Sequence, residues 1–304
     1  MIIQFFLNFN LIFEINLLII KYIKKMNKSC FPFKICILFL IALFFNILNL
    51  PAEIKEAKEV KNLELKKLLE GLKLNGSILI YDYKKNTFYS NDFKWAKTAH
   101  LPASTFKIPN SIIALETGIV ENDSSISKWD GKERYLKVWE QDLKFKDAFK
   151  FSCVPCYQEI ARKIGFSRMK SYLKKLDYKG MVFNEKTIDN FWLEGKSKIS
   201  QFEQIDFLKR FFFLKLPISK RTSVLMKNIM IAEKTDKYTL SGKTGWGVRQ
   251  GNNNGWYVGY VEVNNEVFFF ATNVEPKKDF NIDNFNSVRL KLTKEALKLM
   301  KIIN

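Results

Sequence analysis

The amino-acid sequence predicts an α+β fold with a mostly helical insertion. Strand-like runs lie towards both ends of the chain, and helical periodicity dominates between them. The sequence contains no internal repeat and no low-complexity linker. The chain has 304 residues, of which 47% are hydrophobic and 27% charged, so it can bury a sizeable core. This composition excludes a disordered polymer.

The first fifty residues have the pattern of an export signal. Residues 1–25 are apolar with a basic end, and Met26 opens a second pattern in which two lysines precede the apolar run 35–48. That run is shorter than the roughly 18 residues of a spanning helix, so we expect a secretory signal within residues 1–52 and a periplasmic protein without a stable membrane partner. Met26 is an alternative start, and a retained anchor is the alternative to cleavage.

The remaining residues, 53–304, are expected to form one domain of two lobes. Apolar residues at helical spacing predict an amphipathic helix over 54–73, which Gly71 ends. A β-hairpin is expected from 76–82 and 87–90, because both runs are strand-like and flank a polar turn.

Helices are expected through the middle of the chain and strands after it. The helix at 104–118 is stopped by Gly118, and a loop is expected at 178–200. Residues 264–265, Asn-Asn, predict a hairpin turn between the last two strands. The other expected helices are 158–164, 168–176, 201–213 and 287–303, and the expected strands are 238–244, 255–263 and 266–274. The terminal parts, about 53–103 and 236–304, are thus expected to form the α/β lobe and about 104–235 the helical lobe.

The chain is strongly basic, with 50 Lys and Arg against 31 Asp and Glu and a formal charge of +19. Most of these cations are lysines dispersed along the whole chain, whereas nucleic-acid readers favour clustered arginines. We therefore expect a solvated basic surface and no nucleic-acid partner, with nucleic-acid or anionic-membrane binding as the alternative. The only histidine, His100, excludes multi-histidine zinc sites, argues against a Ser-His-Asp triad and is expected in a loop.

Two of the four cysteines, Cys30 and Cys36, fall inside the expected signal. The other two, Cys153 and Cys156, have C-x-x-C spacing, which can mark a redox dithiol. No thioredoxin-like βαβ pattern precedes them, so we expect a structural disulfide or two small buried thiols instead.

Three short segments can carry chemistry. Ser104 and Lys107 open a predicted helix, where the i, i+3 spacing puts the hydroxyl and the amine on one face. A serine hydroxyl needs a base to become a nucleophile, and a desolvated lysine can lose its charge and act as one. The residues 243–245, Lys-Thr-Gly, end a predicted strand and can supply a positive field, a hydroxyl and close backbone approach. Ser152, in the segment 152–154, can relay a proton.

Together and in this order, these segments resemble a known family. Residues 102–110 (PASTFKIPN) resemble the nucleophile segment of the class D β-lactamases, the oxacillinases. The resemblance covers roughly residues 75–300. It continues through four further segments, namely the S-x-V loop at 151–155, the tryptophan loop at 188–195, the K-T-G strand at 242–246 and the following strand at 255–260. One segment departs, because residues 178–180 are Tyr-Lys-Gly where the family usually has Tyr-Gly-Asn.

The resemblance implies the serine β-lactamase and penicillin-binding-protein-like fold, with an antiparallel sheet flanked by helices. It also implies hydrolysis of penicillin-type antibiotics, and hence resistance to them, through an acyl-enzyme on Ser104. The implied general base is Lys107 carboxylated by CO2 or bicarbonate (N6-carboxylysine), with no metal and no dissociable cofactor. Ser152 and Lys243 are implied as the remaining catalytic residues. The implied surroundings of the carbamate are Phe106, Val154 and Trp192, and the implied substrate-binding residues are Thr244, Gly245, Trp246 and Arg289.

Other functional classes remain open. A β-lactam sensor domain is acylated once and stays acylated, so multiple turnover of a chromogenic cephalosporin discriminates the enzyme from it. A penicillin-binding transpeptidase usually has Ser-x-Asn where this chain has Ser152-Cys153-Val154. A basic membrane-surface protein is a more distant alternative. The expected partner is a small β-lactam substrate, and the expected assembly is a monomer or a homodimer.

Overall fold

The computed structural model describes residues 56–249 and 251–304. The expected signal within 1–52 and the alternative start at Met26 lie outside the described residues. Within the described ranges, no helix combines the length and apolar character needed to cross a bilayer.

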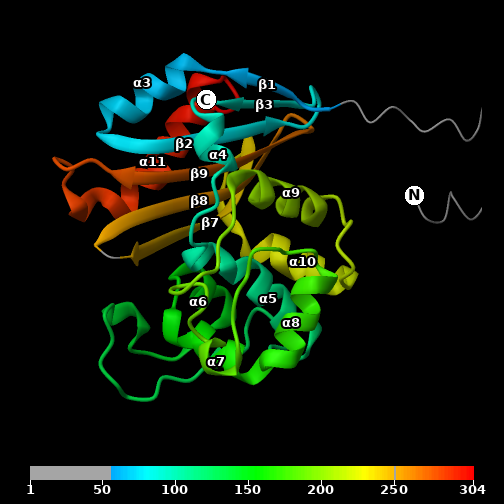
Figure 1. The fold of residues 1–304 in the computed structure, drawn as a ribbon. Helices are drawn as coiled ribbons and strands as arrows, with labels where there is room; N and C mark the ends of the chain where they lie inside the picture. The colour runs from blue at the N-terminus through cyan, green and yellow to red at the C-terminus, as the bar shows by residue number, and fades with distance from the viewer. Residues whose placement is uncertain (1–55, 250) are drawn as a thin grey trace, which may run out of the picture. The chain divides into compact units, whose positions relative to one another are not determined.

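A seven-stranded sheet forms the centre of the described chain (Figure 1). Its strand order is β1-β3-β2-β9-β8-β7-β6, so strands from both ends of the sequence meet in its middle, where β2 pairs with β9. Only β1 and β3 run parallel, and every other pair in the sheet is antiparallel. The strands are β1 Lys58–Lys61, β2 Leu74–Asp82, β3 Thr87–Ser90, β6 Ile231–Lys234, β7 Tyr238–Arg249, β8 Asn252–Val263 and β9 Glu266–Pro276.

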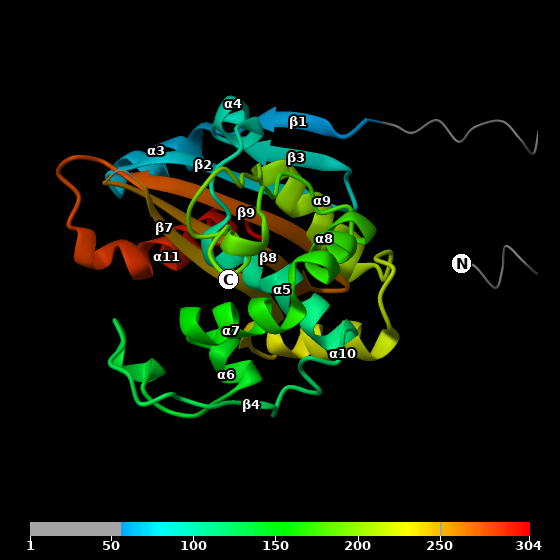
Figure 2. The ribbon, with the colours of Figure 1, turned by 60° about the horizontal axis from the view of Figure 1, so that its bottom comes forward.

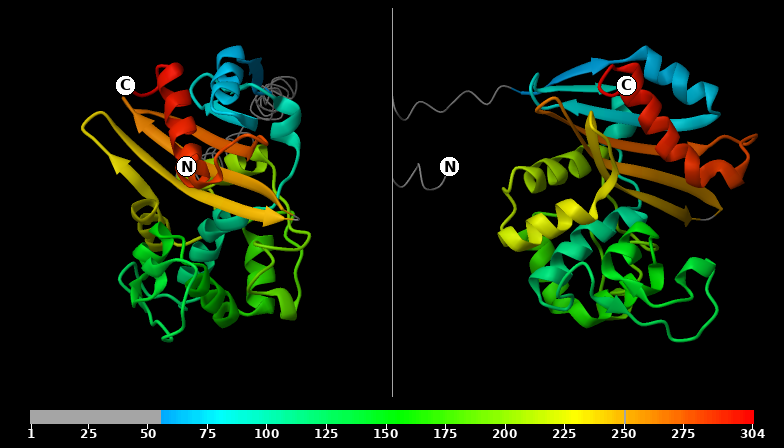
Figure 3. Two further views of the ribbon diagram at one scale, coloured as in Figure 1. Left: turned by 90° about the vertical axis from the view of Figure 1, so that its left-hand side faces the viewer. Right: turned by 180° about the vertical axis from the view of Figure 1, so that it is seen from behind.

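Helices cover both faces of this sheet. On one face lie α3 (Leu63–Gly71) and α11 (Phe285–Leu299), which face the viewer in the right-hand view of Figure 3. Neighbouring residues of β8 point to opposite faces, because side chains alternate along a strand. Tyr257 belongs to the core under α3 and α11, whereas Trp256 and Val258 belong to the larger core on the other side.

The larger core is built around α5 (Lys107–Glu116), nine of whose ten residues are buried. Figure 2 shows the surrounding helices gathered below the sheet, and α7, α8 and α10 each contact α5. A short antiparallel pair, β4 (Ile126–Ser127) and β5 (Leu143–Lys144), lies at the edge of this group. The remaining helices are α4 Phe93–Lys97, α6 Phe145–Lys150, α7 Val154–Ile164, α8 Phe166–Lys175, α9 Gln201–Phe212 and α10 Lys220–Ile229.

One expected helix is wrong over part of its length. The described part of 54–73 begins with the strand β1, which pairs in parallel with β3, and the helix α3 begins only at Leu63. Asn62 marks the boundary, because its side chain accepts hydrogen bonds from the backbone N–H groups of Glu64 and Leu65. Pairing with β3 at the edge of the sheet thus satisfies backbone hydrogen-bonding groups of β1. This pairing outweighs the helical spacing of the side chains in this segment.

The other expected elements are confirmed with shifted ends. The helix at 104–118 starts as a 3₁₀ turn over Ala103–Phe106 and continues as α5, and Gly118 follows with a positive φ. Asn264 and Asn265 both have positive φ in the turn that joins β8 to β9. The strands of the second half start at Ile231 rather than 238, since β6 adds an edge to β7. The division into two lobes stays a prediction.

Candidate active site

The hydroxyl of Ser104 and the amine of Lys107 are in direct contact. Ser104 lies in the 3₁₀ turn and Lys107 is the first residue of α5, so three residues of helical backbone bring their side chains together. Lys107 Nζ donates a hydrogen bond of 2.9 Å to Ser104 Oγ. Ser104 is 7% exposed and Lys107 is fully buried, so the pair lies at the boundary between the core and the solvent.

Burial changes the acid–base character of the Lys107 amine. Removal from water lowers its pKa from 10.5 to about 7, because the ammonium form loses its hydration. The ring of Tyr157 lies 5.0 Å from Nζ and is itself fully buried. Near neutral pH about half of these amines are therefore uncharged and can accept a proton.

A second serine–lysine pair stands beside the first. Lys243 Nζ, on β7, donates a 2.6 Å hydrogen bond to Ser152 Oγ and a 3.0 Å bond to the carbonyl of Thr244. Burial lowers the pKa of Lys243 well below its usual range, and the positive charges of Lys107 and Arg289 lower it further. Ser152 has a φ of 56°, a left-handed conformation that is uncommon for a residue with a side chain.

A cavity of about 310 Å³ opens over both serines. Gly245 on β7 forms part of its wall and lies against the turn that carries Ser104. A Cβ at this position would stand 3.2 Å from the carbonyl of Pro102 and from Thr105, so a glycine lets the strand approach the turn. The cavity is lined by Ser104, Tyr135, Leu136, Trp139, Ser152, Val154, Thr244, Gly245, Trp246, Val248, Asn286 and Arg289.

Arg289 supplies a fixed positive charge to this cavity. It lies on α11, is 2% exposed, and donates from Nε to the carbonyl of Phe285 (2.9 Å) and from Nη1 to the carbonyl of Gly245. Its Nη2 donates to Asn286, both to the carbonyl (3.0 Å) and to Oδ1 (2.6 Å). Burial lowers the pKa of Arg289 to about 10, so the guanidinium remains charged at neutral pH.

Phe106 and Trp192 form an aromatic wall in the same core. Their rings stack with centroids 5.3 Å apart, and both side chains are fully buried. The indole Nε1–H of Trp192 is buried without a hydrogen-bond partner. An unpaired buried donor costs free energy, which makes this N–H available to an additional acceptor.

The structure brings the sequence-predicted site residues together. Ser104, Ser152, Val154, Thr244, Gly245, Trp246 and Arg289 line one cavity, and the two lysines bond to its two serines. His100 lies elsewhere, in a bridge with Ile199 and stacked on Trp95, as expected for a loop residue. Within the described ranges, no three His, Cys, Asp or Glu side chains are grouped to hold a metal ion. The absence of a metal from the reaction stays a prediction.

The segment that departs from the family pattern packs behind Phe106. Tyr178 is buried with its ring 6.0 Å from that of Phe106, and Gly180 pairs with Lys198. Gly180 has a positive φ of 78°, and a Cβ there would overlap the carbonyl of Lys198. The segment 178–180 therefore has a buried tyrosine and a glycine at a position where the backbone conformation requires one.

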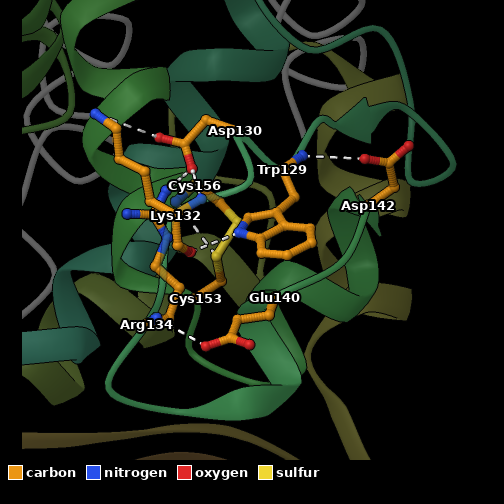
Figure 4. Close-up of polar contacts among 8 residues, drawn as sticks. All are labelled: Trp129, Asp130, Lys132, Arg134, Glu140, Asp142, Cys153 and Cys156. Carbon is orange, nitrogen blue, oxygen red and sulfur yellow. Dashed lines mark hydrogen bonds and ion pairs between the residues drawn. A yellow bond between two sulfur atoms is a disulfide. The ribbon is translucent and has the colours of Figure 1, made fainter.

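Several lining residues were missed by the motif analysis. Tyr135, Leu136 and Trp139 come from the loop between β4 and β5, which carries no recognisable pattern. Figure 4 shows how this loop is held by its own polar contacts, such as the bond from Trp129 N to Asp142 Oδ1 (3.0 Å). Two other residues could have been found from their place in the sequence. Asn286, which lines the cavity, precedes Arg289 by one helical turn on α11. Tyr157, whose ring lies against Lys107, follows the Ser152 segment in α7.

Comparison with known proteins gives consistent matches. The penicillin-binding protein transpeptidase domain matches residues 74–298. β-Lactamase OXA-48 of Klebsiella pneumoniae is 38% identical over 265 residues, which cover 87% of this chain and 96% of the relative. β-Lactamase OXA-10 of Pseudomonas aeruginosa is 41% identical, covering 73% of this chain and 81% of the relative. The crystal structure of a class D β-lactamase from Sebaldella termitidis superposes with a TM-score of 0.78 at 39% identity, covering 82% of this chain and all of that one.

Proposed function

The chain belongs to the class D serine β-lactamases, and from this premise we propose the roles that its own residues take in opening the β-lactam ring. The protein is a hydrolase of the cyclic amide bond of β-lactams. The transpeptidase domain alone would fit a sensor or a penicillin-binding protein as well. The names of the relatives favour the hydrolytic enzyme over these alternatives.

Ser104 is the nucleophile. Its hydroxyl attacks the lactam carbonyl carbon, the C–N bond of the ring breaks, and an ester joins the substrate to Ser104 Oγ. The single observation that carries this role is the 2.9 Å contact between Ser104 Oγ and the buried amine of Lys107. The Lys107 side chain is placed to take the serine proton and later a proton from the water that hydrolyses the ester.

The surroundings of Lys107 fit a carboxylated lysine. Carbamate formation needs an uncharged amine, and burial makes the uncharged form accessible near pH 7. Once formed, a carbamate supplies an anionic oxygen that accepts a proton. Trp192 has a free buried Nε1–H to donate to such an oxygen, while Phe106 and Val154 limit the access of water. Carbon-13 bicarbonate tests this role, because a carbamate carbon signal is expected in the wild type and absent from Lys107→Ala.

The remaining residues handle the leaving nitrogen and the substrate carboxylate. Ser152 and Lys243 form a hydrogen-bonded pair that can pass a proton to the lactam nitrogen. Thr244 and Arg289 line the cavity and provide a hydroxyl and a buried guanidinium for the carboxylate. The backbone N–H groups of Ser104 and Trp246 are the proposed donors to the oxyanion.

The site of action is part of the proposal. The enzyme acts in the periplasm after removal of residues 1–52, as a monomer or a homodimer. Amino-terminal sequencing of protein recovered from the periplasm tests the cleavage, and sedimentation equilibrium tests the assembly.

Turnover of a chromogenic cephalosporin tests the function. Many molecules hydrolysed per enzyme support the hydrolase, and Ser104→Ala should abolish the reaction. A burst of one equivalent without further turnover would instead assign the protein to the β-lactam sensors or penicillin-binding proteins.

A further inference from the structure

We infer that the disulfide between Cys153 and Cys156 is a positioning element of the active site, whose reduction slows turnover while the fold remains intact. This inference rests on the proposed function. It assigns a role to two residues that take no part in the mechanism above. The bond joins Cys153, the residue before α7, to the first turn of α7. Ser152, which precedes Cys153, bonds to Lys243, and the ring of Tyr157, which follows Cys156, lies against Lys107.

The disulfide closes the first turn of α7 (Figure 4). Cys153 caps the helix, and its Sγ accepts a hydrogen bond from the backbone N–H of Cys156 at 3.3 Å. Cys153 is 1% exposed, whereas Cys156 is half-buried. The bond therefore fixes the residue before the helix to the helix itself.

Ser152 stands directly before this bond in a strained conformation. Its positive φ is disfavoured for a residue with a side chain, so neighbouring contacts must hold it there. Ser152 N donates to the carbonyl of Phe149 (3.1 Å) and Cys153 N donates to the carbonyl of Ala148 (2.9 Å). Because Cys153 is bonded at both its backbone and its sulfur, it limits the rotation of Ser152 away from Lys243.

The other side of the disulfide leads to Lys107. Tyr157 follows Cys156, and its ring lies 5.0 Å from Lys107 Nζ. The Tyr157 hydroxyl is 2.7 Å from Ser111 Oγ, and its carbonyl accepts a long bond of 3.5 Å from the Asn110 amide. A shift of the first turn of α7 would thus disturb groups at both serine–lysine pairs.

The span of the bond favours positioning over global stability. The disulfide closes a loop of only four residues, so it restricts the unfolded chain less than a bond across a long loop would. Catalysis is more sensitive, because a displacement of about 1 Å in a reacting group can slow a reaction by about 100-fold. Reduction should therefore change kcat more than it changes thermal stability.

A dithiol reductant can break this bond by ordinary exchange. A thiolate of the reductant attacks the sulfur of Cys156, the less buried of the two residues, and Cys153 leaves as a thiolate at the N-terminus of α7, where the helix dipole stabilises it. The second thiol of the reductant then releases Cys156 and forms a cyclic disulfide. Two electrons and two protons pass to the protein in all.

The test compares oxidised and reduced enzyme with one substrate. Wild-type protein is assayed with a chromogenic cephalosporin before and after treatment with dithiothreitol, with free thiols counted and the fold followed by circular dichroism. We expect kcat to fall at least tenfold with a far smaller change in KM and an unchanged circular dichroism spectrum. Reoxidation with oxidised glutathione should restore kcat.

The double variant Cys153→Ala/Cys156→Ala is the matched control. It is expected to have the low kcat of the reduced enzyme and to be insensitive to the reductant, which excludes effects of the reductant at other sites. Equal kcat in the oxidised and the fully reduced wild type would overturn the inference and leave the β-lactamase function intact. Failure of the proposed function would look different, since the oxidised enzyme itself would then show no turnover. Loss of the circular dichroism signal on reduction would also overturn the inference, because the bond would then hold the fold rather than the site.

Discussion

Replacing Lys107 by methionine is expected to stabilise the fold while abolishing turnover. The substitution keeps an unbranched side chain of similar length in a fully buried position, places a thioether sulfur where a methylene was, and removes the titratable amine. The amine is the group that the proposed mechanism requires. Its burial is also a cost to folding, because the unfolded chain binds a proton at this site that the folded chain binds weakly.

The cost follows from the two pKa values. Burial lowers the pKa of Lys107 from 10.5 to about 7, which at 1.36 kcal/mol per pH unit corresponds to about 5 kcal/mol in acidic solution. Loss of the hydrogen bond to Ser104 offsets about 1 kcal/mol of the gain. The free energy of unfolding of Lys107→Met should therefore be about 4 kcal/mol larger than that of the wild type at pH 6.

The stability advantage of Lys107→Met over the wild type should shrink as the pH rises. Between pH 7 and 10.5 the unfolded chain binds more protons at position 107 than the folded chain does, so the stability of the wild type increases with pH across this window. At pH 9 the advantage of the variant should fall to about 1 kcal/mol. Below pH 7 both states of the wild type are protonated and the full advantage is present.

Urea denaturation in CO2-depleted buffer at pH 6 and pH 9 measures both values. Lys66→Met, at an exposed position on α3, is the matched control and should leave stability and turnover nearly unchanged. The reasoning is refuted if Lys107→Met is less stable than the wild type at pH 6, or if the difference does not narrow at pH 9. Wild-type turnover in the variant would remove Lys107 from the mechanism.

Three further predictions concern the carbamate and the substrate carboxylate. Turnover in CO2-depleted buffer should fall from pH 8 to pH 6, because the uncharged fraction of Lys107 falls from about nine-tenths to about one-tenth. Added bicarbonate should raise the turnover rate, and a rate that does not respond to bicarbonate would contradict the carbamate role. Trp192→Phe removes the unpaired indole donor, so the bicarbonate concentration for half-maximal activity should rise about tenfold, and an unchanged value would exclude that contact. Arg289→Lys keeps the charge but loses the planar fork, so KM for benzylpenicillin should rise about tenfold with little change in kcat; a loss in kcat alone would place Arg289 in another role.

The sequence was informative where spacing along one element determines the geometry. The three-residue spacing of Ser104 and Lys107 implies one helical face, and the structure has their side chains in contact. The Asn264–Asn265 turn and the strands around it follow from local turn chemistry and alternation in the same way.

Tertiary contacts decided the rest. The segment Lys58–Lys61 has helical spacing, but pairing with β3 makes it a strand. No local pattern marks Tyr135 or Trp139 as cavity residues, because a loop stabilised by its own carboxylates brings them there. The pairing of Cys153 with Cys156 was one of two open alternatives, and the folding of α7 is what brings the sulfurs together.

The most direct test of the central claim is intact-protein mass spectrometry after brief exposure to benzylpenicillin, followed over time and by peptide mapping. A mass increase equal to one penicillin on the peptide that carries Ser104, which then disappears as the free enzyme returns, is the expected result. In Lys107→Ala, Ser104 should stay unlabelled if acylation fails, or should keep the label if only hydrolysis of the ester fails. A label on another residue, or no label on an enzyme that turns over, would contradict the account of Ser104 activated by the buried Lys107.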